Sequence, residues 1–142
     1  MIKVFLVEDE KIIRKSIKNN VKWEENGFEF AGEAPDGEMA LPMIEKLHPD
    51  IVITDIKMPF MDGLELAKHI HEDYMNTKVI LFSGWDDFEY ARRALKLGVQ
   101  DYLTKPINMD ELTYLASDCV RRFDEARKDS FEDREDLLRK LL

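Results

Sequence analysis

Cysteine is almost missing from this sequence, since Cys119 is the only one among 142 residues. A single cysteine cannot form a disulfide within the chain, and no cysteine cluster is available to hold a metal. Long apolar runs are missing as well, which argues against a membrane-spanning helix. The first residues, MIKVFLVEDE, pass from a short apolar run directly into acids, unlike a secretory signal peptide. We therefore expect a cytoplasmic protein without a membrane partner.

An excess of positive charge is also missing, because the formal net charge is -9. Binding to a phosphate backbone depends on basic side chains, so this segment by itself is not expected to hold nucleic acid. An acidic surface still suits a cation or a basic partner, although most of the acids need serve only solubility. The length and the 44% share of hydrophobic residues fit one globular domain with a full core.

Apolar runs alternate with stretches of helical periodicity along the chain. Five strands are predicted, over residues 2–7, 28–34, 51–54, 78–82 and 100–104. The first helix is indicated by Ile12, Ile13, Ile17 and Val21, which recur at helical spacing. The second begins near Asp36-Gly37, and Pro42 inside it should bend or delay it. A third helix is expected near residues 64–74 and a fourth over residues 88–97. Asn108 can cap a fifth, with Glu111 three residues later.

Five strand–helix repeats predict an α/β fold with a doubly wound, five-stranded parallel sheet. Right-handed crossovers place the carboxyl ends of all strands at one edge of the sheet, which is where such folds bind ligands. Polar residues follow four of the five strands at this edge, and they are Glu8 and Asp9, Asp55, Ser83, and Lys105.

Three carboxylates at one edge repel one another, and burial adds to the cost. A divalent cation with oxygen ligands and retained waters removes that penalty, so Mg²⁺ is the expected cofactor and Mn²⁺ a second candidate. An ionised Asp55 beside the cation could attack phosphorus in line and form an acyl phosphate. Lys105 would offset the charge on the transferred group, and Ser83 could donate a hydrogen bond to it.

The segments VEDE, TDIKMPFMDGLEL, LFSG and YLTKP resemble, in this order, the signature segments of response-regulator receiver domains of two-component systems. The resemblance covers roughly residues 1–122. It implies the flavodoxin-like receiver fold with strand order 2-1-3-4-5 and an extended C-terminal helix. It also implies a switch rather than an ordinary enzyme, in which Asp55 accepts a phosphoryl group from a sensor histidine kinase.

The family's roles carry over to the matching positions. Asp55 corresponds to the phosphoacceptor, Asp9 to the direct Mg²⁺ ligand and Glu8 to the outer acid, where many members have aspartate. Lys57 corresponds to the residue whose backbone carbonyl completes the metal site. The remaining matches are the switch pair Ser83 and Tyr102, the lysine Lys105, and a cis peptide bond before Pro106.

The last part of the chain, residues 123–142, has no glycine or proline and reads as a helical linker toward an output domain outside this sequence. A frayed amphipathic tail is the alternative. The segment SGWDDFEYARRALKLGVQDYLTKPI resembles receivers attached to AraC-type DNA-binding domains, which implies transcription regulation, with DNA bound only through such a domain. A homodimer through the fourth helix, fifth strand and fifth helix, or through the C-terminal helix, is compatible with this, and a stand-alone receiver is the other interpretation.

Simpler explanations exist for each residue alone. Glu8 and Asp9 could serve merely to cap the first helix, because acidic side chains near a helix N-terminus interact favourably with the helix dipole. A phosphatase of the haloacid dehalogenase type would need a second aspartate where Lys57 stands. A flavodoxin-like cofactor module would need hydroxyls and amides in the first loop, where Glu8, Asp9 and Glu10 would repel a phosphate.

Lys57 and Trp85 lie two residues beyond Asp55 and Ser83, at positions that tune phosphoryl lifetime in the family. A lysine and an indole beside the site could restrict an attacking water. We predict that Lys57→Ala and Trp85→Ala each change the rate at which a phosphorylated protein loses its phosphoryl group. Intact-mass spectrometry can follow the loss of the phosphoryl group over time. Equal rates of loss in both variants and the parent would refute the prediction.

Overall fold

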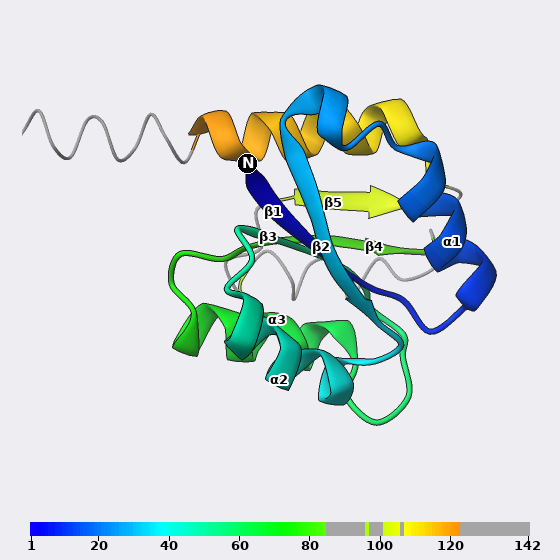
Figure 1. The fold of residues 1–142 in the computed structure, drawn as a ribbon. Helices are drawn as coiled ribbons and strands as arrows, with labels where there is room; N and C mark the ends of the chain where they lie inside the picture. The colour runs from blue at the N-terminus through cyan, green and yellow to red at the C-terminus, as the bar shows by residue number, and fades with distance from the viewer. Residues whose placement is uncertain (85–95, 97–100, 106, 123–142) are drawn as a thin grey trace, which may run out of the picture.

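The computed structural model describes residues 1–84, 96, 101–105 and 107–122. Its centre is one parallel sheet with strand order β2-β1-β3-β4-β5, the order that the family resemblance implied (Figure 1). No helix in the described part of the chain is both long and apolar enough to cross a membrane. The strands are β1 (Ile2–Val7), β2 (Phe28–Ala34), β3 (Ile51–Asp55), β4 (Lys78–Ser83) and β5 (Asp101–Thr104).

Helices cover both faces of the sheet. The labelled helices are α1 (Lys11–Asn20), the short 3-10 helix η1 (Glu24–Asn26), α2 (Gly37–Leu47) and α3 (Gly63–Asp73). Residues 109–122 are also helical. Figure 1 shows α2 and α3 on one face, and α1 with the helix of residues 109–122 on the other. This three-layer arrangement is the doubly wound fold expected from the alternation of strands and helices.

Strand residues alternate between two hydrophobic clusters, because successive side chains of a strand point to opposite faces. Phe5 and Val7 pack in the cluster beneath α2 and α3. Val4 and Leu6 pack in the other cluster, which includes Ile17 of α1. Every residue of β3 is buried, as expected for a central strand of a parallel sheet. The two clusters hold the sheet rigid and keep the carboxyl ends of its strands in register.

Several predicted boundaries shift in the structure. Strands β3 and β4 each extend one residue further, to Asp55 and Ser83. Pro42 does not delay α2, which already begins at Gly37, because the Asp36 side chain accepts a hydrogen bond from the Met39 amide at 2.8 Å and caps the first turn. The predicted cap of the fifth helix is confirmed, since the Glu111 amide donates to Asn108 Oδ1 at 3.0 Å.

Some predictions fall on residues outside the described part. These concern Trp85, the first residue of the fifth strand, the cis bond at Pro106, and residues 123–142. The predicted fourth helix also lies outside it, except for residue 96, which is helical.

Gly63 brings the start of α3 directly against the end of β3. Its amide donates to the carbonyl of Ile56 at 2.7 Å. A Cβ atom built on Gly63 would lie 2.0 Å from the carbonyl oxygen of Asp55, far inside van der Waals contact. Only glycine fits this approach. The close contact ties the position of Asp55 to the first turn of α3.

Candidate phosphoacceptor site

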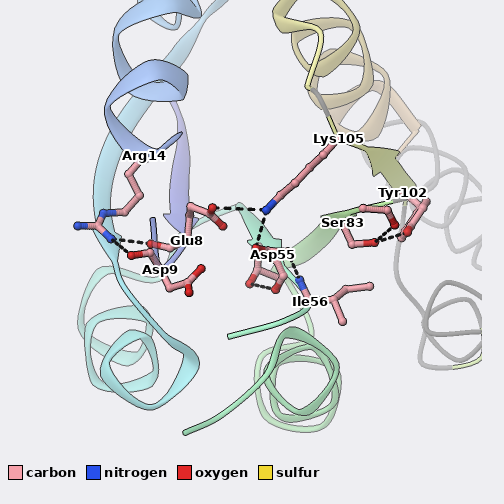
Figure 2. A network of polar contacts seen from close by, with 10 residues as sticks. Glu8, Asp9, Arg14, Asp55, Ile56, Ser83, Tyr102 and Lys105 are labelled. Carbon is pink, nitrogen blue, oxygen red and sulfur yellow. Dashed lines mark hydrogen bonds and ion pairs between the residues drawn. The ribbon is translucent and has the colours of Figure 1, made fainter. Parts of the chain in front are cut away.

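The predicted acids meet at the carboxyl edge of the sheet. Glu8 and Asp9 follow β1, and Asp55 is the last residue of β3. One carboxylate oxygen from each lies within 4.8 Å of the others, which is close enough for one metal ion to contact all three. Figure 2 shows the three side chains converging from two neighbouring strands. The convergence predicted for the carboxyl ends of parallel strands is therefore present in the structure.

Lys105 reaches this cluster from the end of β5. Its Nζ atom donates to Asp55 Oδ2 at 2.9 Å and lies 3.5 Å from Glu8 Oε1 (Figure 2). Burial alone would lower the pKa of Lys105, but the hydrogen bond and charge of Asp55, together with Glu8, outweigh it and raise the pKa above its usual value. Lys105 therefore stays protonated and offsets part of the negative charge.

Asp55 is held firmly. Its side chain is buried, with 3% of the residue exposed. The Oδ1 atom accepts a hydrogen bond from the Ile56 amide at 2.7 Å, while Oδ2 accepts the one from Lys105. Each of the two oxygens is thus oriented by a separate hydrogen-bond donor, which fixes the carboxylate in one position.

Glu8 is the member of the cluster whose negative charge is most costly to bury. It is completely buried, and neither carboxylate oxygen has a hydrogen-bond partner. Burial raises the pKa of Glu8 to about 8, with further contributions from the neighbouring Asp55 and Asp9 carboxylates, whereas Lys105 acts in the opposite direction. Without a metal, Glu8 is thus mostly protonated at neutral pH.

The residues present fit a hard divalent cation. Buried carboxylate oxygens without a hydrogen bond are costly unless a ligand satisfies them, and among the described residues both oxygens of Glu8 are of this kind. Asp9 is exposed, so its carboxylate is open to solvent and to an entering ion. An all-oxygen set with an open side, where waters can complete the shell, matches the preference of Mg²⁺.

Ser83 and Tyr102 form a second polar contact beside the acids. Their hydroxyl groups are hydrogen-bonded to each other (Figure 2). The Ser83 hydroxyl also donates to the carbonyl of Gly84 at 3.3 Å. Ser83 is buried and Tyr102 half-buried. The structure thus couples the two residues that the sequence assigned to a switch.

The other predicted site residues are only partly placed. Lys57 lies two residues beyond β3 in the following loop, with its side chain exposed. Trp85 and Pro106 are outside the described residues. One residue at the site was missed entirely: Arg14 of α1, whose guanidinium lies behind Glu8 and Asp9. The only signal in the sequence was a single arginine one turn into the helix that follows the acids.

An apolar groove opens next to the acids, with a volume of about 640 Å³. It runs between α1 and the segment that joins β5 to the helix of residues 109–122. Ile12, which belongs to the predicted apolar stripe of α1, is 82% exposed at this groove rather than packed in the core. The lining residues are Ile12, Ile13, Ser16, Ile17, Lys105, Ile107 and Met109.

Comparison with known sequences agrees with this site. The chain matches the family model described as "Response regulator receiver domain" over residues 4–117. It is 42% identical over 112 residues to the uncharacterized transcriptional regulatory protein YesN of Bacillus subtilis (strain 168), covering 79% of this chain and 30% of YesN. It is 37% identical over 121 residues to the transcriptional regulatory protein HptR of Staphylococcus aureus (strain NCTC 8325 / PS 47), covering 85% of this chain and 47% of HptR. The chain spans less than half the length of these relatives.

Solved structures show the same fold. The REC domain of AraT, a response regulator from Geobacillus stearothermophilus, superposes with a TM-score of 0.81 at 36% identity, covering 88% of this chain and 97% of that domain. A two-component transcriptional regulator AraC from Clostridium phytofermentans ISDg gives a TM-score of 0.78 at 29% identity, covering 91% and 99%.

The raised pKa of Glu8 predicts how the stability of the metal-free protein depends on pH. The folded state holds the proton up to about pH 8, whereas the unfolded chain releases it near the ordinary value of 4.5. Between these values the unfolded state binds fewer protons, so the free energy of unfolding falls as the pH rises, by at most about 1.4 kcal/mol per pH unit for one group. Glu8→Gln should lack this fall.

Urea unfolding in a chelator between pH 5 and 8 measures the effect. Glu29→Gln, which changes an exposed carboxylate on β2, serves as the matched control and should follow the parent. Parallel curves for the parent and Glu8→Gln would show that Glu8 does not carry the proton.

Proposed function

Because this chain belongs to the response-regulator receiver family, we propose that it is a phosphorylation-operated switch in which Asp55 accepts a phosphoryl group from a sensor histidine kinase. The observation that carries the proposal is the environment of Asp55. This buried carboxylate accepts hydrogen bonds from Lys105 and Ile56 and lies beside Glu8 and Asp9. A surface carboxylate with a merely structural role has no need of this combination.

The proposed reaction is a single in-line displacement at phosphorus. An Asp55 oxygen forms a new P–O bond while the P–N bond of the donor phosphohistidine breaks. The electron pair of that bond stays on the imidazole nitrogen, and a ring protonated on its other nitrogen leaves as neutral histidine. Lys105, already 2.9 Å from Asp55, stays close enough to offset the charge on the phosphoryl oxygens. Mg²⁺, held by Asp9, Asp55 and Glu8, would supply the additional positive charge that the transfer needs.

The switch would work through the Ser83–Tyr102 contact. A phosphoryl group on Asp55 brings nearly two negative charges and strong acceptor oxygens. Ser83 can then donate to a phosphoryl oxygen instead of engaging Tyr102. Tyr102 is on β5, so this change reaches the surface formed by β5 and its neighbouring helices, and alters dimerisation or output contacts by a shift between two populations.

A protein donor also needs a surface on which to bind. The apolar groove beside Lys105, with Ile12 exposed at its rim, offers one within reach of Asp55. An amphipathic helix of a kinase could bury its apolar face there. This placement accounts for an apolar surface on an otherwise acidic protein.

The output is proposed to be control of transcription through a DNA-binding domain. YesN and HptR are both named as transcriptional regulatory proteins, and both are more than twice as long as the part this chain matches. We classify the chain as a regulated cytoplasmic switch rather than an enzyme, since its product stays attached to Asp55. A receiver that acts alone through protein contacts is the alternative.

The phosphoacceptor assignment is tested by labelling with acetyl phosphate. The parent should gain one phosphoryl group in the presence of Mg²⁺ and none in a chelator, as measured by intact-mass spectrometry. Asp55→Asn should abolish the labelling, because an amide cannot act as the nucleophile. The matched control is Asp73→Asn, which changes an exposed acid at the end of α3 and should be labelled like the parent. Equal labelling of Asp55→Asn and the parent would assign the reaction to another residue.

A further inference from the structure

A half-buried arginine, Arg14, holds the backbone of the two acids that follow β1. Arg14 Nη1 donates to the carbonyl oxygen of Glu8 at 2.6 Å and to that of Asp9 at 3.4 Å (Figure 2). Its side chain is 15% exposed, and the contact with Glu8 is partly buried whereas the contact with Asp9 is open to solvent. We propose that Arg14, anchored by Glu33, is a positioning residue for the divalent-cation site. The inference rests on the function proposed above and adds a residue to it.

The anchor comes from the neighbouring edge strand. Arg14 Nε lies 3.6 Å from Glu33 Oε1 on β2. The other oxygen of Glu33 lies 3.9 Å from Lys18 Nζ, one turn further along α1. The Glu8 amide donates to the carbonyl of Ala34, the residue after Glu33, at 3.1 Å. Glu8 and Asp9, which form the acid loop, are therefore fixed to β2 at two points. The Glu8 amide makes one contact directly, and the Arg14 guanidinium makes the other by bridging the loop to Glu33.

Arg14 and Lys105 contact different atoms of the acids. Lys105 contacts the carboxylate oxygens of Asp55 and Glu8, the atoms that a metal ion would use. Arg14 reaches Glu8 and Asp9 through their main-chain carbonyls, so it restrains the loop while leaving their carboxylate oxygens available. This matters most for Asp9, which is exposed and whose orientation depends on its backbone. A cation placed behind the ligands also moderates their mutual repulsion.

Groups that orient metal ligands without touching the metal typically contribute about 10- to 100-fold to its affinity. We therefore expect Arg14→Met, which keeps the aliphatic stem and removes every donor, to raise the Kd for Mg²⁺ about tenfold or more. Arg14→Lys keeps the charge and a single donor nitrogen, and should recover part of this loss. Glu33→Gln weakens the anchor and should raise the Kd by a smaller factor. Lys18→Met removes the other cation near Glu33, does not contact the acid loop, and should match the parent.

Isothermal titration with Mg²⁺ measures the Kd, and urea unfolding in a chelator measures stability separately. A merely structural arginine would lower stability and leave the Kd unchanged. Labelling with acetyl phosphate gives a third readout, because excess Mg²⁺ should restore the labelling rate of Arg14→Met toward that of the parent.

Two results would overturn the inference: a parental Kd in Arg14→Met, or an equal rise in Arg14→Met and Lys18→Met. If Arg14→Met fails to fold, unchanged Kd values in both Arg14→Lys and Glu33→Gln would overturn it equally. Failure of the proposed function is recognised in a different sample, since the parent itself would then neither bind Mg²⁺ nor be labelled on Asp55.

Discussion

The repulsion among three carboxylates at one edge of the sheet is the constraint around which this protein is arranged. Glu8, Asp9 and Asp55 bring their oxygens within 4.8 Å of one another, and Glu8 is fully buried. Such a cluster persists only if protons or cations offset its charge. Lys105 supplies one positive charge, and a proton on Glu8 accounts for part of the remainder. A divalent cation is the further partner that this charge balance favours.

The fold fixes the positions of the three acids and of Lys105 relative to one another. Three different strands deliver the acids and the lysine, and the strands are fixed by clusters on both faces of the sheet. Gly63 allows α3 to pack directly against the carbonyl of Asp55, and Arg14 is hydrogen-bonded to the backbone of the loop after β1. In the switch proposed above, a change of charge at Asp55 would meet this fixed frame, and the exchange of a hydroxyl contact at Ser83 would carry it to the surface.

Much of this arrangement could be predicted from the sequence because it depends on local patterns. Apolar strands followed by polar residues identify Asp55 and Lys105, and the strand order of a doubly wound sheet brings them together. The complete burial of Glu8 beside an exposed Asp9 could not be predicted, since it depends on how β1 packs against its neighbours. The contacts of Arg14 join a side chain to main-chain carbonyls, which leave no mark in residue types. Ile12 follows the helical period of α1 yet lies beyond the core, because periodicity does not show where a packed face ends.

Anomalous diffraction from crystals grown with Mn²⁺ tests the central claim most directly, because Mn²⁺ takes the same oxygen ligands as Mg²⁺ and is visible by its own scattering. The account predicts a single strong peak between Asp9 and Asp55, at a coordination distance of about 2.1 Å from their carboxylate oxygens, with Glu8 turned toward it. Crystals that contain the ion elsewhere, or nowhere, while Lys105 remains bound to Asp55, would contradict it.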